Sequence, residues 1–185
     1  KKASRIPNPL ALNMYVLGYD SKKKLVNVNQ AVKENLQTYL GQYRMVTDAI
    51  NIKNAYVINI GVKFSLMTRP TFNKNEVLLR AIETVKTFFN IDRWQVNQPI
   101  ILSDLVYQLS LVDGVATIVP PVEDNKQSLP IIITNKYKTA NGYSGNLYDI
   151  DTATKNGIIY PSLDPSIFEL KYPGIDIEGH VAGDN

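Results

Sequence analysis

The stretch from Ala55 to Thr68 shows the regular alternation of a β-strand. Apolar side chains stand at every second position, and mainly polar or small ones stand between them. Because successive side chains of a strand point to opposite faces, this pattern predicts a long strand with one buried and one wetted face. The apolar face is Tyr56, Ile58, Ile60, Val62, Phe64 and Leu66, and the wetted face is Asn59, Gly61, Lys63 and Ser65.

Helical spacing appears on both sides of this strand. Asn29 is a good N-cap for an amphipathic helix from Gln30 to about Arg44, and we expect its apolar stripe to pack on the sheet. A second helix is predicted after a cap at Asn75 and ends near Asn90. A third starts at Ser103 and stops at Gly114. Shorter strands are predicted at 12–19, 115–119 and 129–134.

The order strand, helix, strand, two helices, strand predicts an α+β fold with a ferredoxin-like split β-α-β layer. Its sheet is mainly antiparallel and carries helices on one face. Residues 1–11 are interpreted as a linker from a missing N-terminal part, and residues 12–122 as the α+β domain. Residues 123–185 form an extension in which 157–160 and 166–172 make a β-hairpin around a proline-flanked turn. Because a hairpin is marginal alone, it needs a surface to lie on.

Composition excludes several classes of protein. The 185 residues contain no cysteine, so disulfides and thiolate sites are excluded. The net charge is +3, and Lys22 to Lys24 is the longest run of basic residues, which is not the clustered pattern of a nucleic-acid module. No apolar run reaches the roughly 18 residues of a membrane-spanning helix. Since the chain does not start with Met, we expect it to be cut from a longer polypeptide.

The sequence offers few residues that could support catalysis. His180 is the only histidine and lies in a tail rich in Gly and Asp, so no catalytic triad or histidine metal site is indicated. Asp149 and Asp151 could bind a cation, although solvation in a turn is the favoured reading. The glycine-containing stretch 141–145 opens no predicted helix and fails the test for phosphate binding. The sequence therefore predicts no catalytic residue, no cofactor, no metal and no enzyme activity.

Aromatic residues in the second half of the chain are candidates for an interface. Trp and Tyr are enriched at interface hot spots, although such side chains more often pack within their own chain. The predicted interface residues are Trp94, Ile167, Phe168 and Tyr172.

Several segments, taken in order, resemble the baseplate J-like family of contractile phage tails. These are Asn75–Ile82, Phe88–Trp94, Asn97–Ile100, Ser103–Leu105 and Val112–Val115. Upstream segments at 39–44 and 57–62 are also similar to that family. Asn97 departs from it, because many members have Gly there. The closing stretch 156–173 is similar to the C-terminal part of the baseplate wedge subunits of T-even-like myophages.

This resemblance implies a structural protein of the virion that is assembled in the host cytoplasm. Such a subunit forms homodimers within and between wedges, and so closes a ring around the hub that rearranges when the sheath contracts. Its other partners are baseplate wedge and hub-proximal subunits, without nucleic acid or membrane.

Two other functions remain open from the residues alone. A ferredoxin-like module could bind nucleic acid or a peptide through the wetted face that carries Asn59, Lys63 and Ser65. A hydrolase of cell-wall sugars would need a pair of carboxylates at a cleft, of which Glu76, Glu83 and Glu169 give no sign.

Overall fold

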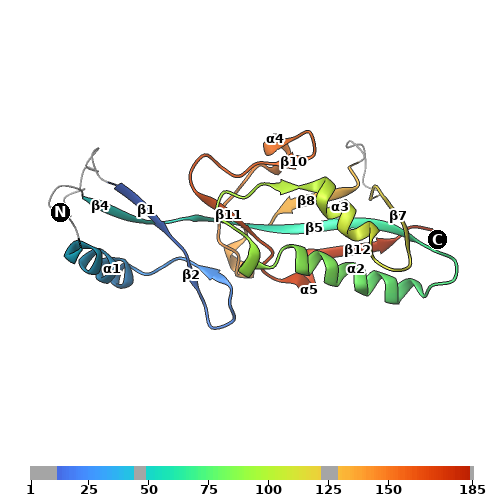
Figure 1. Cartoon of the computed structure of the whole chain (residues 1–185), viewed down its shortest axis with the longest axis horizontal. Helices are drawn as coiled ribbons and strands as arrows, with labels where there is room; N and C mark the ends of the chain where they lie inside the picture. Colours follow the sequence, from blue (N-terminus) through green and yellow to red (C-terminus); the bar gives the residue numbers. More distant parts are fainter. Residues whose placement is uncertain (1–11, 44–48, 122–128, 184–185) are drawn as a thin grey trace. The chain divides into compact units, whose positions relative to one another are not determined.

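The computed structural model describes residues 12–43, 49–121 and 129–183, and the chain divides into two compact units, residues 1–56 and 57–185. Helices and strands occur in both units, so the predicted α+β class is confirmed (Figure 1). The predicted linker at 1–11 and the predicted domain boundary at 122 lie outside the described residues.

Unit 1 is a small β-α-β arrangement with a two-stranded parallel sheet. The strand predicted at 12–19 is broken at Leu17, and its first part pairs with the last strand of the unit, from Leu12 opposite Ile50 to Val16 opposite Asn54. A short antiparallel hairpin follows, whose turn is closed by Asp20 Oδ1 accepting hydrogen bonds from two backbone nitrogens further along. The elements are β1 (Leu12–Val16), β2 (Gly18–Tyr19), β3 (Leu25–Val26), α1 (Gln30–Gln42) and β4 (Ile50–Asn54).

Helix α1 starts where the sequence predicts, because Asn29 Oδ1 accepts a hydrogen bond from the backbone nitrogen of Val32 at 2.9 Å. The helix packs against β4, and Gln37 Nε2 donates to the carbonyl oxygen of Ile50. However, none of its residues is buried. The stripe therefore packs on the sheet only in part: Leu36 and Leu40 are half-buried, whereas Val32, Tyr39 and Tyr43 stay exposed, since two strands form a narrow surface.

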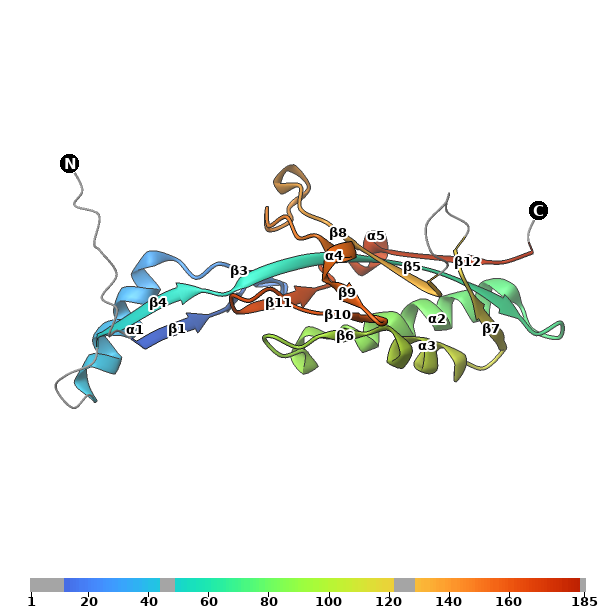
Figure 2. The ribbon, with the colours of Figure 1, turned by 90° about the horizontal axis from the view of Figure 1, so that it is seen from above.

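Unit 2 is larger and is built around one strand of 13 residues, β5 (Tyr56–Thr68) (Figure 2). Two longer helices and a series of short strands follow it. These elements are α2 (Lys74–Phe88), η1 (Ile91–Arg93), β6 (Ile100–Ile101), α3 (Leu102–Ser110), β7 (Val115–Val119), β8 (Ile131–Asn135), η2 (Thr139–Asn141), α4 (Ile150–Ala153), β9 (Thr154–Lys155), β10 (Ile158–Ile159), β11 (Ser166–Glu169), α5 (Pro173–Asp176) and β12 (Ile177–Val181).

Strand β5 has four neighbours in a five-stranded sheet. β8 and β7 pair with it antiparallel, along 60–64 and 65–68, while β12 pairs parallel along 62–66, and β11 also borders it. Because β8 and β12 pair with the same residues of β5, they must lie on opposite edges of it. The predicted mainly antiparallel sheet is thus a mixed one, and two of its strands come from the last twenty residues.

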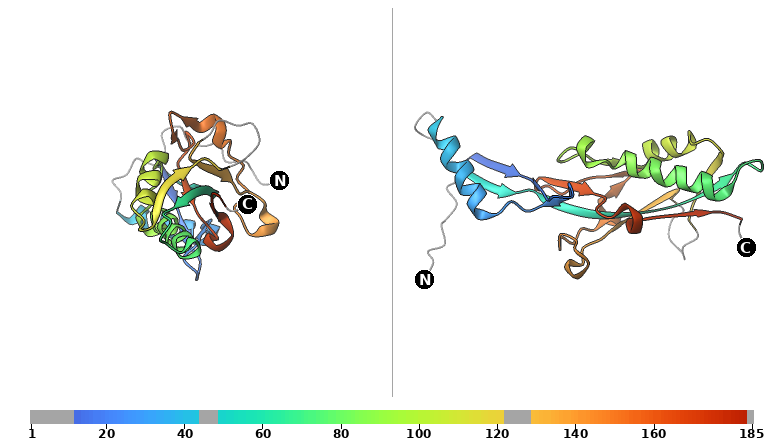
Figure 3. Two further views of the ribbon diagram at one scale, coloured as in Figure 1. Left: turned by 90° about the vertical axis from the view of Figure 1, so that its right-hand side faces the viewer. Right: turned by 90° about the horizontal axis from the view of Figure 1, so that it is seen from below.

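The predicted buried face of β5 is confirmed, but the predicted wetted face is wrong, because Asn59 and Ser65 are buried as well. Its apolar side chains from Ile58 to Leu66 are at most 2% exposed, and Tyr56, the first residue of the strand, is the exception at 50%. Helices α2 and α3 lie on one side of the sheet, and the segment 136–149 lies on the other (Figure 3). On the helix side, Gly179 of β12 lies so close to Phe64 and Leu78 that a Cβ there would be 2.7 Å from the Phe64 ring.

Both helices begin one or two residues before the predicted positions. Asn73, not Asn75, caps α2, and its Oδ1 accepts from the backbone nitrogens of Asn75 and Glu76. Helix α3 starts at Leu102 without a side-chain cap, so Ser103 lies in its first turn. The predicted stop at Gly114 is wrong, because α3 already ends at Ser110; Gly114 has φ +92°, a backbone conformation that favours glycine, and lies in the turn before β7.

The predicted hairpin of 157–160 with 166–172 is wrong. Strand β10 pairs with β9 and β6, whereas β11 pairs with β5 in a different sheet. All four residues of β11 are buried, so this segment belongs inside unit 2. The hairpin that does form joins β9 to β10 through Asn156 and Gly157, which both have positive φ, as a type I′ turn requires.

Candidate assembly surfaces

Trp94, the first predicted interface residue, packs inside unit 2. Its ring lies 5.8 Å from the ring of Phe88 and 5.3 Å from that of Phe89, centroid to centroid, and the residue is 9% exposed. The 3₁₀ turn η1 places it there, because Asn90 Oδ1 accepts from the backbone nitrogen of Asp92 and starts that turn. The indole nitrogen is buried without a hydrogen-bond acceptor among the described residues.

The other predicted interface residues also make contacts within the chain. Ile167 and Phe168 lie in β11, are 4% and 1% exposed, and Phe168 contacts the ring of Tyr148. Tyr172 is half-buried with its ring 5.4 Å from that of Tyr143. Their burial is explained by packing within one copy, so their proposed role in self-association stays a prediction.

A buried polar network fastens the C-terminal half to the start of β5. Asn59 is fully buried, and its Nδ2 donates to Glu169 Oε2 at 2.7 Å, while its Oδ1 accepts from the backbone nitrogen of Ser144 at 2.8 Å. Ser144 Oγ and Asn146 Nδ2 both donate to the carbonyl oxygen of Val57. Because buried polar groups are stabilising only when paired, this network fixes the segment 144–146 against β5.

A second polar cluster holds the turn before β12. The Asp176 carboxylate is buried and accepts from Tyr143 Oη at 2.6 Å and from the backbone nitrogen of Tyr172 at 2.8 Å. Burial and the neighbouring carboxylate raise the pKa of the Tyr143 phenol far above its usual range. The phenol therefore stays protonated and acts as a fixed hydrogen-bond donor.

Possible catalytic and metal-binding groups are not brought together in the part of the chain that the structure describes. His180 lies exposed in β12, and Asp149 caps α4 by accepting from the backbone nitrogen and hydroxyl of Thr152. Among described residues, no group of three or more His, Asp or Glu could hold a metal ion. No described helix has both the length and the apolar composition needed to cross a bilayer.

The face of β5 that the sequence predicts to be wetted is buried or takes part in an ion pair. Asn59 and Ser65 are buried, at 0% and 7% exposure. Lys63 is half-buried, with its Nζ 3.4 Å from Glu178 Oε2 on β12. The face that a nucleic acid or peptide would use is therefore occupied by the protein's own residues.

Part of the uncovered apolar surface of unit 1 lies on and just after α1, and Leu12, Tyr19 and Tyr56 are exposed elsewhere in the unit. Val32 is 50% exposed, Tyr39 56% and Tyr43 73%, and the rings of the two tyrosines are 5.1 Å apart. These residues follow helical spacing, so they lie along one stripe. Among the described residues of unit 1, the only buried apolar side chains are Leu25, Ile50 and Ala55.

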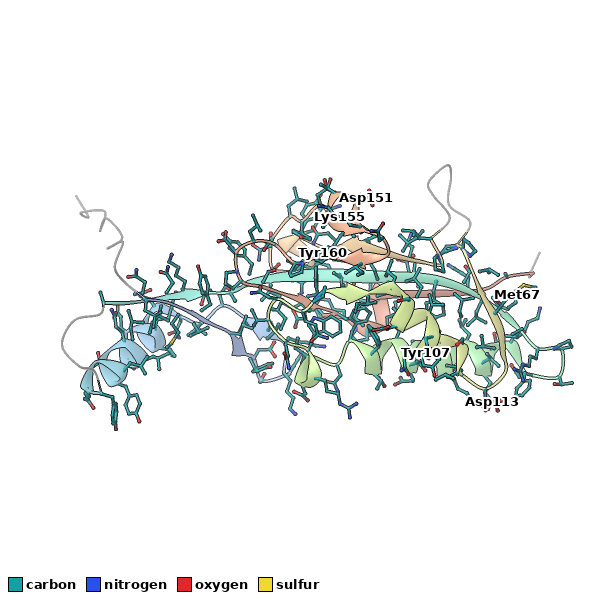
Figure 4. The ribbon with its side chains drawn as sticks, turned by 45° about the horizontal axis from the view of Figure 1, so that its top comes forward. Met67, Tyr107, Asp113, Asp151, Lys155 and Tyr160 are labelled. Atoms are coloured by element: carbon teal, nitrogen blue, oxygen red, sulfur yellow. The ribbon has the colours of Figure 1, made fainter. Side chains whose placement is uncertain are left out.

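Unit 2 has an apolar groove of about 520 Å³ beside α3. One wall is the outer face of the helix, including Tyr107, which is 60% exposed and labelled in Figure 4. The opposite wall comes from Leu129 and Pro130 and from the turn at Gly157, whose carbonyl oxygen accepts from the backbone nitrogen of Leu102. The remaining lining residues are Leu102, Ser103, Val106 and Ser110.

Sequence reasoning missed both surfaces. The periodic residues of α1 were predicted to be covered, and nothing in the sequence brings residues 129–130 and 157 beside α3. No protein-family model and no curated protein matches this chain. The resemblance to baseplate proteins therefore stays a prediction, and function must be argued from the surfaces.

Proposed function

We propose that this chain is a structural assembly subunit that associates with other copies of itself and has no catalytic role. One observation carries the proposal: α1 bears an apolar stripe and has no buried residue. Exposed apolar stripes of this kind mark interaction surfaces in soluble proteins.

The sheet of unit 1 supports the same conclusion. Parallel sheets are normally covered on both faces, and a pair of strands is marginal without further packing. Unit 1 has two parallel strands and one helix, and it has very few buried side chains. Covering one exposed Val or Leu stabilises a complex by roughly 1.5 to 3 kcal/mol before the costs of association. A partner that covers α1 would therefore supply the core that the unit lacks.

We place this assembly role in the wedge of a contractile phage tail baseplate, following the family resemblance of the sequence. In that setting the chain forms homodimers within and between wedges, closes the ring around the hub, and contacts other wedge and hub-proximal subunits. The virion location is a prediction of the same resemblance, whereas the ferredoxin-like connectivity is a prediction from the order of the sequence elements.

The two alternative functions have less support. Binding of nucleic acid or a peptide through the sheet would need the face of β5 that carries Asn59 and Ser65, which is covered. Sugar hydrolysis would need two carboxylates at a cleft. Glu76 and Glu83 form ion pairs with Arg80 and Lys86 along α2, and Glu169 is buried against Asn59.

Light scattering across a dilution series tests the proposal. We expect a mass above that of the 20.8 kDa monomer at micromolar concentration, falling on dilution. Tyr39→Ala/Tyr43→Ala on α1 should weaken the association, while Leu163→Ala, which removes a fully exposed apolar side chain elsewhere, should leave it unchanged. A monomer at every concentration, or equal association of all three proteins, contradicts self-association through α1.

A further inference from the structure

The C-terminal strand β12 has one open edge. It pairs in parallel with β5, from Ile177 opposite Val62 to Val181 opposite Leu66, and no other strand of the described residues borders it. Unpaired backbone groups at such an edge can pair with another chain, so natural proteins usually protect an edge with Lys, Pro or a bulge. Strand β12 contains no Lys or Pro, and its register with β5 is unbroken. The open edge can therefore take up a further strand.

The pairing with β5 determines which backbone groups of β12 reach the open edge. In a parallel pair, alternate residues direct their backbone groups to the neighbouring strand. The backbone nitrogen of Ala182 donates to the carbonyl oxygen of Leu66 at 2.8 Å, so the even-numbered residues bond to β5. The odd-numbered residues of β12 therefore direct their N–H and C=O groups outward. Two of these, Gly179 and Val181, are half-buried, so the edge is partly exposed there.

The sequence of β12 is complementary to itself in an antiparallel arrangement. When two copies are centred on Gly179, this residue lies opposite itself, and Ile177 lies opposite Val181 of the second copy. Every outward-directed residue then meets another outward-directed residue, as the closely spaced bonds of an antiparallel pair require. Between them, Glu178 of each copy lies opposite His180 of the other. Imidazole N–H groups donate hydrogen bonds to carboxylates, so both cross-strand pairs are favourable.

The side chains of these cross-strand pairs are accessible. Glu178 has its Oε2 3.4 Å from Lys63 Nζ and its Oε1 3.9 Å from Lys136 Nζ, yet its side chain is 39% exposed. His180 is exposed and lies opposite Ser65 in the register with β5. A second copy can therefore approach both side chains without breaking an ion pair.

Apolar side chains are also exposed close to this edge. Helix α2 packs against β12, and its Leu78 lies against Gly179. The adjacent Leu79 is 64% exposed, and Ile175, two residues before β12, is 71% exposed. Apolar surface that a second copy removes from water adds to the stability of a strand pair, which is marginal when backbone groups alone form it.

We propose that β12 of one copy pairs with β12 of a second copy, antiparallel and across a two-fold axis at Gly179. The contact is isologous, because both copies use the same surface, and it is closed once two copies have met. This inference goes beyond the proposed function, which places self-association on α1, and adds a second self-contact in unit 2. A chain that has both contacts can join more than two copies.

Disulfide trapping tests this register. The chain contains no cysteine, so Glu178→Cys and His180→Cys each add one thiol. In the proposed pair these two positions face each other with Cα atoms about 4.5 Å apart, a distance that a disulfide can bridge. With oxidised glutathione as the oxidant, an equimolar mixture should form linked dimers that contain one copy of each variant. Each variant alone should link far less, because identical positions are two residues out of register. Thr117→Cys on β7, mixed with His180→Cys, measures linkage by random collision.

Charge at residue 180 gives a second test, by light scattering, in the Tyr39→Ala/Tyr43→Ala background that removes the α1 contact. His180→Glu should weaken dimerisation about fivefold, because it places glutamates opposite Glu178 at two symmetric positions, and His180→Lys should strengthen it by a similar factor. Thr117→Glu and Thr117→Lys make the same changes of charge at an exposed position of β7, on the opposite edge of β5, and should have no effect. Circular dichroism checks that each variant is folded.

The outcomes separate this inference from the proposed function. If the unmodified chain associates but the mixture links no more than the Thr117→Cys control, or the two changes at His180 have the same effect, the β12 contact is wrong and self-association through α1 stands. If the mixture links while Tyr39→Ala/Tyr43→Ala associates like the unmodified chain, the β12 contact is right and the role of α1 fails. If the unmodified chain is a monomer throughout and nothing links, both fail.

Discussion

The two units of this chain are made of the same kinds of elements but bury them to very different degrees. In unit 2, β5 has neighbours on both edges, two helices on one face and a loop segment on the other. In unit 1, a 13-residue helix joins two parallel strands and has no buried residue. Regular secondary structure is therefore no evidence of a core, because helices and strands form from local signals and a core needs matching surfaces.

The difference also assigns different roles to the units. A unit with its own core can hold a fixed shape, while a unit without one is stabilised mainly by what it binds. We therefore expect unit 2 to determine the stability of the chain and unit 1 to respond to assembly. The predictions below test this contrast, beginning with the largest effect.

Truncation of a core side chain should show the difference in stability between the two units most clearly. Phe168→Ala in β11 should lower the free energy of unfolding by about 3 to 5 kcal/mol, because it leaves a cavity in a fully buried site. Tyr39→Ala on α1 should change it by less than about 0.5 kcal/mol, as is usual at the surface. Urea denaturation of the two variants measures both values. Equal losses would mean that unit 1 has a core of its own.

Loss of a buried amide should come next. Asn59→Ala removes the partner of Glu169 and of the Ser144 backbone nitrogen. It should lower the free energy of unfolding by about 1 to 3 kcal/mol. Asn51→Ala is the matched change in unit 1, where the amide makes one exposed hydrogen bond of 3.4 Å to Asn13. We expect that variant to unfold like the unmodified chain. A larger loss of unfolding free energy for Asn51→Ala than for Asn59→Ala would contradict the conclusion that unit 2 holds the core.

Helix caps offer a finer comparison, since both helices are capped by Asn. Asn73→Ala should lower the global free energy of unfolding by about 1 kcal/mol, because α2 is part of the cooperative core. Asn29→Ala should leave global unfolding nearly unchanged and speed hydrogen exchange only in α1, which opens locally. Hydrogen exchange read residue by residue distinguishes the two results. Global destabilisation by Asn29→Ala would show that unit 1 unfolds together with unit 2.

The smallest expected effect is on pH dependence. Because the folded protein raises the pKa of Tyr143, its contribution to stability is complete below the ordinary tyrosine value of about 10 and is lost as the pH rises through the folded value. Tyr143→Phe should therefore flatten the fall in stability at alkaline pH. In unit 1 the pKa of Tyr39 is also raised, mainly by Tyr43, but the side chain is exposed and water screens the interaction, so Tyr39→Phe should flatten the profile much less. Urea unfolding from about pH 8 to about pH 11 gives both profiles.

Local signals in the sequence predicted most of the longer elements. The alternation from Ile58 to Leu66 located β5 and its buried face, and Asn29 located the start of α1, whereas α3 ends at Ser110, before the predicted stop at Gly114. The Asn-Gly pair at 156–157 is a strong short-range signal for a hairpin, whereas the predicted turn lies at the prolines 161 and 165.

What the sequence did not reveal is which strands meet. Period-two alternation identifies a strand without naming its neighbour, so the parallel pairing of β12 with β5 across more than a hundred residues left no local trace. The same limit applies to the candidate surfaces. Whether Trp94 is buried or Tyr39 is exposed depends on the elements that happen to cover them, and the groove joins three separate segments of the chain.

The covalent continuity of β5 with unit 1 has a mechanical consequence. Strand β4 ends at Asn54 and β5 begins at Tyr56, so a pull on unit 1 enters unit 2 at the first residue of a strand that spans roughly 43 Å. The hydrogen bonds to its neighbours run across the strand, and a force along the strand therefore loads many of them in shear at once. Under such a force, the contact that holds α1 should therefore break before β5 separates from its neighbours.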